Sequence, residues 1–156
     1  MSEQSAYLKW GVMTSTLEEL EKRTQILEDI EEIKKVQRKY VFCLCNRQWD
    51  DLLDCFAEDG IADIGTHGRR EGKKEVRKLV YNCFDKLAKT PPHLVGQPVI
   101  SVDGDKAKGH WILYLFPHGP KMVWGQGRYE NEYVRENGKW KFRLVKFIHP
   151  WPVRTK

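Results

Sequence analysis

Acid–base or nucleophilic chemistry in this 156-residue chain would depend first on its five histidines and four cysteines. The cysteines are Cys43, Cys45, Cys55 and Cys83. They lie in stretches with helical spacing, without paired C-x-x-C motifs or histidines at zinc-finger spacing. The histidines are His67, His93, His110, His118 and His149. No three of them combine with carboxylates at a spacing typical of a metal site, so we expect no metal and reduced, mostly buried thiols.

Tyr40 and His93 occupy positions from which a side chain could reach a buried ligand. Tyr40 falls on the apolar stripe of a predicted helix, and buried tyrosine hydroxyls usually find a hydrogen-bond partner in the protein or in a ligand. His93 follows a double proline at the entry to a predicted strand, where it either bonds a backbone carbonyl or faces a pocket. Gln97 lies four residues further on the same strand face, and it either binds a ligand or satisfies the sheet edge.

The first half of the chain, which contains Tyr40, has the apolar periodicity of helices. Ser15 and Thr16 each open a capping box, so we predict that a long helix begins there. Residues 1–15 are predicted to be a mobile N-terminal arm, and residues 16–156 a single domain. A short amphipathic helix is predicted from Trp49 to the Asp59-Gly60 turn, followed by a brief strand over residues 61–64. Apolar residues at helical spacing predict another helix over residues 76–87, and the double proline that follows ends it.

The residue pattern of the second half of the chain predicts β-strands. Four runs with strand character follow residue 93, and D-G and N-G turns separate two pairs of them. Helices followed by a four-stranded antiparallel meander make the predicted fold class α+β. Because a long aromatic sheet curls, we expect helices against its concave face to leave an apolar pocket lined by large side chains.

Composition and charge narrow the classes of partner. The net charge of +5 is concentrated in RREGKKEVRK, where two glutamates interrupt the run, so a solvated helix face explains it and no nucleic acid is expected. The sequence has neither a long uncharged apolar run nor a signal-peptide pattern, so no membrane partner is expected. We therefore predict a cytoplasmic protein.

Four stretches of the sequence, taken together, form a pattern that is specific enough to indicate a family. They are the tyrosine-bearing helix with NRQWDDLLDCFAEDG, then GTHGRREGKKEVRKL, PPHLVGQPVISVDGDKA and GRYENEYVRENGKWKF. Together they resemble the SnoaL-like branch of the nuclear transport factor 2 superfamily, over nearly everything from about Leu27 to Ile148. The resemblance implies a cystatin-like α+β barrel, in which a conical curved antiparallel or mixed sheet wraps around the N-terminal helices and encloses an apolar pocket.

For the lyases of this branch, the resemblance implies a histidine–aspartate dyad in that pocket. The histidine falls on His93. The aspartate position lies five residues beyond the helix tyrosine, Tyr40, and four before Trp49, and Cys45 occupies it. A thiol is a poor acceptor and, with a reference pKa of about 8.5, is mostly uncharged at neutral pH. The standard dyad is therefore absent at this position.

The resemblance leaves three kinds of function open. The first is a cofactor-independent lyase or isomerase for a hydrophobic, cyclic small molecule, with His93 as general base, Tyr40 as polarising donor and Cys45 tuning the site or acting as a thiolate. The second is a non-catalytic module that binds such a molecule. The third is an assembly domain that forms a homo-oligomer, a dimer or trimer, through the exposed sheet face. The predicted ligand-binding residues are Trp49, Gln97, Trp111, Leu113, Trp124 and Tyr129.

Overall fold

The structure is a computed structural model that describes residues 3–86, 92–116 and 125–148, with the backbone alone for residues 3–15 and 66. Its helices are α1 (Glu3–Asn46), α2 (Trp49–Asp54) and α3 (Lys73–Leu79), with a 3-10 turn η1 (Gly65–His67) and a π-helical turn η2 (Val80–Phe84). Its strands are β1 (Phe56–Ile64), β2 (Arg69–Glu71), β3 (His93–Asp103), β4 (Lys106–Leu115), β5 (Gly125–Glu136) and β6 (Lys139–Ile148).

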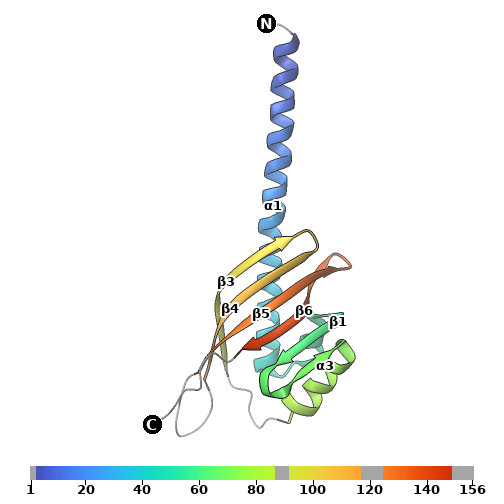
Figure 1. Ribbon diagram of the computed structural model, residues 1–156, viewed down its shortest axis with the longest axis vertical. Helices are drawn as coiled ribbons and strands as arrows, with labels where there is room; N and C mark the ends of the chain where they lie inside the picture. Colours follow the sequence, from blue (N-terminus) through green and yellow to red (C-terminus); the bar gives the residue numbers. More distant parts are fainter. Residues whose placement is uncertain (1–2, 87–91, 117–124, 149–156) are drawn as a thin grey trace.

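The described strands form one mixed sheet in the order β2-β1-β6-β5-β4-β3. Strands β3 to β6 are the predicted antiparallel meander, and β1 joins it by parallel pairing with β6. Asn137 and Gly138 connect β5 to β6 with φ values of 51° and 74°, as a type I′ hairpin turn requires. The lower part of α1 lies against one face of the sheet (Figure 1). The predicted α+β class is confirmed.

Helix α1 begins at Glu3, well before the start predicted at Ser15 or Thr16. Its upper part projects beyond the sheet, whereas its lower part buries Ile33, Gln37 and Tyr40 (Figure 1). The capping boxes therefore lie inside the helix, because the residues before them can also adopt helical geometry. The predicted division of the chain at residue 15 stays a prediction. No described helix is both long enough and apolar enough to cross a membrane.

The boundary between α2 and β1 differs from the predicted one. Helix α2 ends at Asp54, and Phe56 starts a strand instead of continuing the helix to Asp59-Gly60. Phe56 pairs with Phe142 of β6, and the backbone N–H of Phe142 donates to the carbonyl of Cys55 at 2.8 Å. Pairing between segments distant in sequence thus overrides the helical spacing of Phe56. The predicted helix over residues 76–87 is observed as α3 and η2, and residue 87 lies outside the described residues.

One buried carboxylate anchors α1 to the β5–β6 hairpin. Asp29, 4% exposed, accepts hydrogen bonds from Arg135 Nη2 at 2.7 Å, Trp140 Nε1 at 3.0 Å and Gln25 Nε2 at 3.2 Å. The Arg135 guanidinium also lies 4.6 Å from the centre of the Trp140 ring. Burial alone would raise the pKa of Asp29, but the hydrogen bonds outweigh it and hold that pKa below its ordinary value.

Replacing Asp29 with Asn is expected to lower the free energy of unfolding at pH 7 by about 3 kcal/mol, because Arg135 loses its buried counter-charge. Since the folded pKa of Asp29 is lowered, its contribution is present above the unfolded value of about 3.9 and is lost as the pH falls through the folded value. Urea unfolding curves of the two proteins should therefore differ at pH 7 and converge below about pH 4.

Asp105→Asn is the matched control for this change. Asp105 also pairs with Arg135, at 2.9 Å, but its side chain is 76% exposed. Its loss is expected to cost less than about 1 kcal/mol. If Asp29→Asn were no less stable than Asp105→Asn at pH 7, the ion pair would not be what holds α1 on the sheet.

Candidate functional site

A hollow of about 350 Å³ lies between the C-terminal part of α1 and the edge strand β3, and we call it the α1–β3 groove. Its α1 wall consists of Gln37, Arg38, Val41, Phe42, Cys45 and Asn46. Its sheet wall consists of His93, Leu94 and Val95 of β3 and Trp111 of β4. Cys45 and His93, from segments far apart in the sequence, thus line the same hollow. None of these lining residues is an aspartate or glutamate.

The end of α1 and the start of β3 place these two residues. Helix α1 ends at Asn46, whose Nδ2 donates to the carbonyl of Phe42 at 2.8 Å. Arg47 then reverses the chain with a φ of 59°, and Cys45 therefore lies in the last helical turn. His93 is the first residue of β3 and pairs with Leu115 of β4. Both Cys45 and His93 are partly exposed at the groove.

The other thiols differ from Cys45 in their surroundings. Burial raises the pKa of Cys55 to about 12 and also raises the pKa of Cys43. Neither buried thiol is therefore a thiolate at neutral pH. Cys83 is partly exposed like Cys45, but it does not belong to the groove lining. Cys45 is thus the thiol that a molecule entering the groove would meet.

A buried hydrogen-bond network connects the groove to the middle of the sheet. Trp111 Nε1 donates to the Tyr133 hydroxyl at 3.0 Å, and that hydroxyl donates to Gln37 Oε1 at 3.1 Å. Asn131 Nδ2 donates to the same Gln37 oxygen at 2.8 Å. Burial raises the pKa of Tyr133, so its phenol stays protonated and can donate. Two groove residues, Trp111 and Gln37, are therefore held in fixed orientations.

Tyr40 lies in the aromatic core and is not part of the groove lining. Its side chain is 2% exposed, and its ring contacts Phe56, Tyr129 and Phe142 edge-on with centroid distances of 6.0, 6.3 and 5.3 Å. Burial raises the pKa of Tyr40 and of Tyr129. Tyr129, predicted to bind ligand, is a neighbour of Tyr40 in this core.

Trp49, which was predicted to bind a ligand, binds a side chain of the protein instead. It is buried, and its Nε1 donates to Asp85 Oδ1 at 2.7 Å, which connects α2 to the residue that follows η2. Hydrogen bonds from Trp49 and Arg47 hold the pKa of Asp85 below its ordinary value. Trp49 therefore acts here as a packing residue between helical segments.

The remaining predicted residues occupy several environments. Leu113 is fully buried in the core. Gln97 is exposed and has a φ of 48°, where the β3–β4 pairing shifts between Gly96 and Val99. This irregularity interrupts the alternation that placed Gln97 on the same face as His93. Trp124 lies outside the described residues. The structure thus brings together Cys45, His93 and Trp111.

Sequence reasoning did not identify Gln37 as a site residue. The available signal was a polar side chain at an apolar position of the α1 stripe, and such a residue needs a buried partner. The groove residues Phe42 and Leu94 are each 59% exposed, and apolar periodicity gives no signal for exposed positions of this kind.

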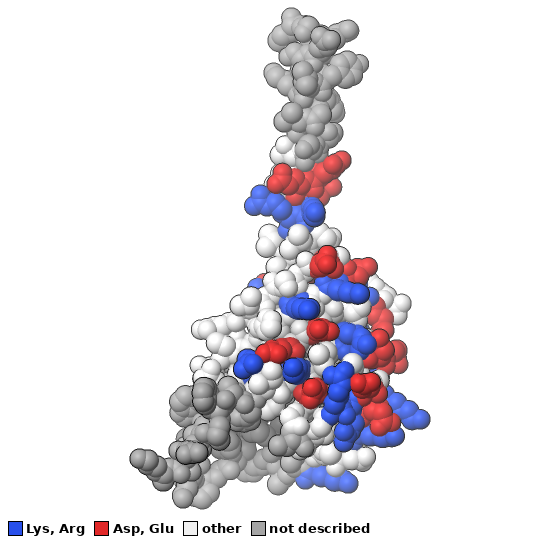
Figure 2. Space-filling view, in the orientation of Figure 1, with Lys and Arg blue, Asp and Glu red and all other residues white. Residues whose placement is uncertain are grey.

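The acidic residues of α2 lie at the surface in ion pairs. Asp50 accepts from Arg77 at 3.0 Å and from Tyr81 at 2.9 Å, and Asp51 pairs with Lys39 at 3.3 Å. Basic and acidic side chains also alternate over the lower right part of the molecule (Figure 2). Within the described ranges, no group of three His, Cys, Asp or Glu side chains could hold a metal ion.

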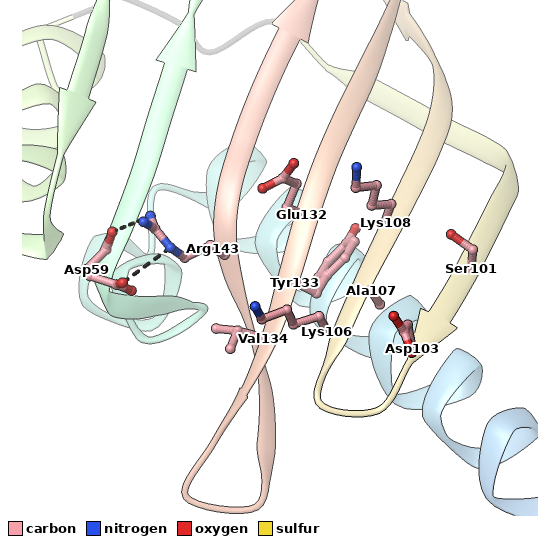
Figure 3. A pocket seen from close by; sticks show the side chains of 10 residues that line it. All are labelled: Asp59, Ser101, Asp103, Lys106, Ala107, Lys108, Glu132, Tyr133, Val134 and Arg143. Carbon is pink, nitrogen blue, oxygen red and sulfur yellow. Dashed lines mark hydrogen bonds and ion pairs between the residues drawn. The ribbon is translucent and has the colours of Figure 1, made fainter. Parts of the chain in front are cut away.

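A second hollow, of about 570 Å³, lies on the outer face of the sheet (Figure 3). Its charged lining residues are Asp59, Asp103, Lys106, Lys108, Glu132 and Arg143. Arg143 Nε and Asp59 Oδ2 form an ion pair at 3.2 Å, as the dashed lines in Figure 3 indicate. This hollow contains none of the predicted site residues, and its mixed charges suit water better than an apolar ligand.

Comparison with solved structures places the chain in a known fold. A protein of unknown function with a cystatin-like fold from Nostoc punctiforme is 23% identical, with a TM-score of 0.69, over 78% of this chain and 92% of that chain. A hexachlorocyclohexane dehydrochlorinase from Novosphingobium barchaimii is 19% identical, with a TM-score of 0.72, over 80% and 88%. An NTF2-like protein of unknown function from Pseudomonas putida is 18% identical, with a TM-score of 0.70, over 79% and 87%.

These likenesses concern the fold, a helix-covered mixed sheet, and they agree with the architecture seen here. The family model for the SnoaL-like domain matches residues 25–146, which span most of the chain from the middle of α1 to β6. The resemblance stated from the four sequence stretches is confirmed. This chain belongs to the SnoaL-like domain family.

Proposed function

We propose that this protein binds a small hydrophobic molecule in the α1–β3 groove and does so without histidine–aspartate dyad chemistry. The observation that carries the proposal is the groove lining, which among the described residues contains Cys45 and His93 but no carboxylate. The volume of about 350 Å³ falls within the range of roughly 300–1,000 Å³ of small-molecule sites.

The walls of the groove support an apolar ligand. Val41 and Phe42 on α1 lie opposite Leu94 and Val95 on β3, and Trp111 closes the sheet side. A few polar groups among such walls are typical of ligand sites, where they orient a molecule that apolar contact holds.

The Cys45 position explains why binding is preferred over catalysis. A dyad carboxylate accepts the imidazole N–H, fixes its tautomer and stabilises the imidazolium that forms when the other nitrogen takes a proton. A thiol at position 45 is a poor hydrogen-bond acceptor in comparison with such a carboxylate. Loss of such a carboxylate costs on the order of 10⁴ in rate in the serine-protease triad. His93 is therefore proposed as a polar contact for the ligand.

A cofactor-independent lyase is the second candidate function. The observation that favours it is that His93 and Cys45, the two predicted dyad positions, line one groove. One solved structure with this fold is a hexachlorocyclohexane dehydrochlorinase. Tyr40, the predicted polarising donor, lies in the aromatic core, so Gln37 or Asn46 would be the donors that line the groove.

Val95→Trp is expected to weaken binding of the uncharged fluorescent probe N-phenylnaphthylamine at least about tenfold, because the larger side chain fills the groove. Val99→Trp is the matched control, since Val99 lies on the same strand, is 70% exposed and does not line the groove. Fluorescence titration measures both dissociation constants. Equal weakening by the two changes would place the probe outside the groove.

Chloride release from hexachlorocyclohexane separates the two candidate functions. We expect wild type and His93→Ala to release chloride equally slowly, because position 45 carries a thiol in place of the carboxylate that a dyad would need. Cys45→Asp supplies the carboxylate, and Cys45→Asn is its uncharged control of similar size. His93-dependent release by the wild type would contradict the binding proposal. Release by Cys45→Asp that disappears in the double variant with His93→Ala would show that the groove geometry suits the lyase.

A further inference from the structure

The side-chain amide of Gln37 is half satisfied. Gln37 is 1% exposed, and its Oε1 accepts two hydrogen bonds, from Asn131 Nδ2 and from the Tyr133 hydroxyl. Its Nε2 is buried and has no hydrogen-bond partner among the described residues. Gln37 also lines the α1–β3 groove. A buried amide N–H without a partner is uncommon and calls for an explanation.

The orientation of this amide follows from its neighbours. The backbone N–H of Lys146 donates to Asn131 Oδ1 at 3.2 Å, so Asn131 turns its Nδ2 toward Gln37. The Trp111 indole can only donate, so the Tyr133 oxygen accepts from it and directs its own hydrogen to Gln37. Rotating the Gln37 amide would place Nε2 against two donors. The network therefore fixes Oε1 on the sheet side and leaves the Nε2 hydrogens available.

We propose that Gln37 Nε2 donates a hydrogen bond to a carbonyl oxygen of the groove ligand, directly or through one bound water. The ligand is then a neutral apolar molecule that carries a ketone or ester group. This inference rests on the proposed function, because it names the ligand class of the same groove. A hydrocarbon of the same shape would leave the N–H unpaired, and a site built for a hydrogen bond discriminates against such an analogue.

A matched pair of probes tests this inference. Acetylnaphthalene and ethylnaphthalene have similar shapes, but only the first carries a carbonyl oxygen. Wild type is expected to bind acetylnaphthalene about tenfold more tightly, as measured by quenching of tryptophan fluorescence. Gln37→Glu keeps the oxygen that Asn131 and Tyr133 need but replaces the N–H donor by a carboxylate oxygen. The preference should disappear in this variant at pH 8.

The outcomes separate this inference from the groove function. Equal affinity of wild type for the two probes, or a preference that persists in Gln37→Glu, would overturn the role of Gln37 while leaving the groove as a binding site. Failure of wild type to bind either probe would overturn both. If Gln37→Glu does not fold, Gln37→Met retains the apolar volume, and the wild-type comparison decides the inference without any variant.

The projecting part of α1 carries a second, independent feature, an exposed apolar stripe. Leu17, Leu20 and Leu27 are 56%, 50% and 65% exposed. With Thr24 they follow alternating steps of three and four residues, and the sequence continues the same steps upstream to Met13 and Trp10. This is the a/d spacing of a coiled coil. The leucine stripe, defined as Leu17, Leu20, Thr24 and Leu27, lies on the face of α1 opposite to Ile33 and Tyr40, by helical geometry.

The charged residues beside the leucine stripe indicate which helix could pair with it and whether the pair is parallel or antiparallel. Arg23 occupies a g position, and Glu21 and Glu28 occupy e positions. In a parallel pair of identical helices, Arg23 of one chain lies opposite Glu28 of the other, whereas an antiparallel pair would bring Glu21 and Glu28 together. Most of the stability of helices in proteins comes from the packing of an apolar face, which the leucine stripe lacks within the described chain. We infer that the leucine stripe forms a parallel two-stranded coiled coil with a second copy of this chain.

Light scattering on the full chain tests the coiled coil. Wild type is expected to have the mass of a dimer, and Leu20→Asp with Leu27→Asp that of a monomer. Val99→Asp is the matched control, because Val99 is 70% exposed and lies on β3, away from the stripe. A monomeric wild type, or a dimer that persists in the double variant, would overturn the inference.

Disulfide cross-linking tests the direction of the two helices. Leu20→Cys should form a dimer disulfide under oxidising conditions, because residue 20 meets its own copy in a parallel pair. Glu18→Cys, on another face of α1, should cross-link no faster than the wild type, which reports the background from the four native cysteines. Equal cross-linking of the two variants would overturn the parallel arrangement.

Discussion

The position of α1 across the sheet depends on two buried polar side chains, Asp29 and Gln37, spaced about two turns apart on one face of the helix. Asp29 takes hydrogen bonds from Arg135 and Trp140, and Gln37 takes them from Asn131 and Tyr133. Apolar packing alone tolerates sliding of a helix along a sheet, whereas fixed donors and acceptors do not, because displacement would leave buried polar groups unpaired. These contacts therefore set the height along the sheet at which Cys45 comes to line the same groove as His93.

The buried hydrogen-bond network around Gln37 also explains how a rigid core can border an open groove. Trp111 contributes one face to the groove and donates its indole N–H inward to Tyr133. The chain of hydrogen bonds ends at a backbone amide, Lys146 N–H, whose direction is set by the strand. The donor-to-acceptor direction of these hydrogen bonds is therefore set by the backbone of the sheet. The Gln37 Nε2 is left as the donor of this network that has no partner among the described residues.

Much of the fold could be predicted from local signals. The meander follows from the Asp103-Gly104 and Asn137-Gly138 turns and from strand-like runs between them, because turn chemistry is short-range. The α2–β1 boundary could not be predicted, since Phe56 has helical spacing but pairs with Phe142, far away in sequence. The start of α1 was missed because capping boxes are permitted inside a helix. Periodicity predicted that Tyr40 is buried, but it does not specify whether the neighbours are a ligand or Phe142.

The candidate site was less predictable than the fold for a related reason. Cys45, His93 and Trp111 were predicted and share one groove, whereas Gln97 was displaced by an irregularity in strand pairing that sequence does not reveal. A thiol at position 45, where the family resemblance implies a carboxylate in related lyases, has two physical effects that act together. It removes the charge that would orient His93, and it spares an apolar molecule the cost of lying beside a desolvated carboxylate. Gln37 adds a neutral polar group to the same wall, and Glu31 balances the charge of Arg38 there at 3.6 Å, so the proposed neutral ligand would need no counter-charge of its own.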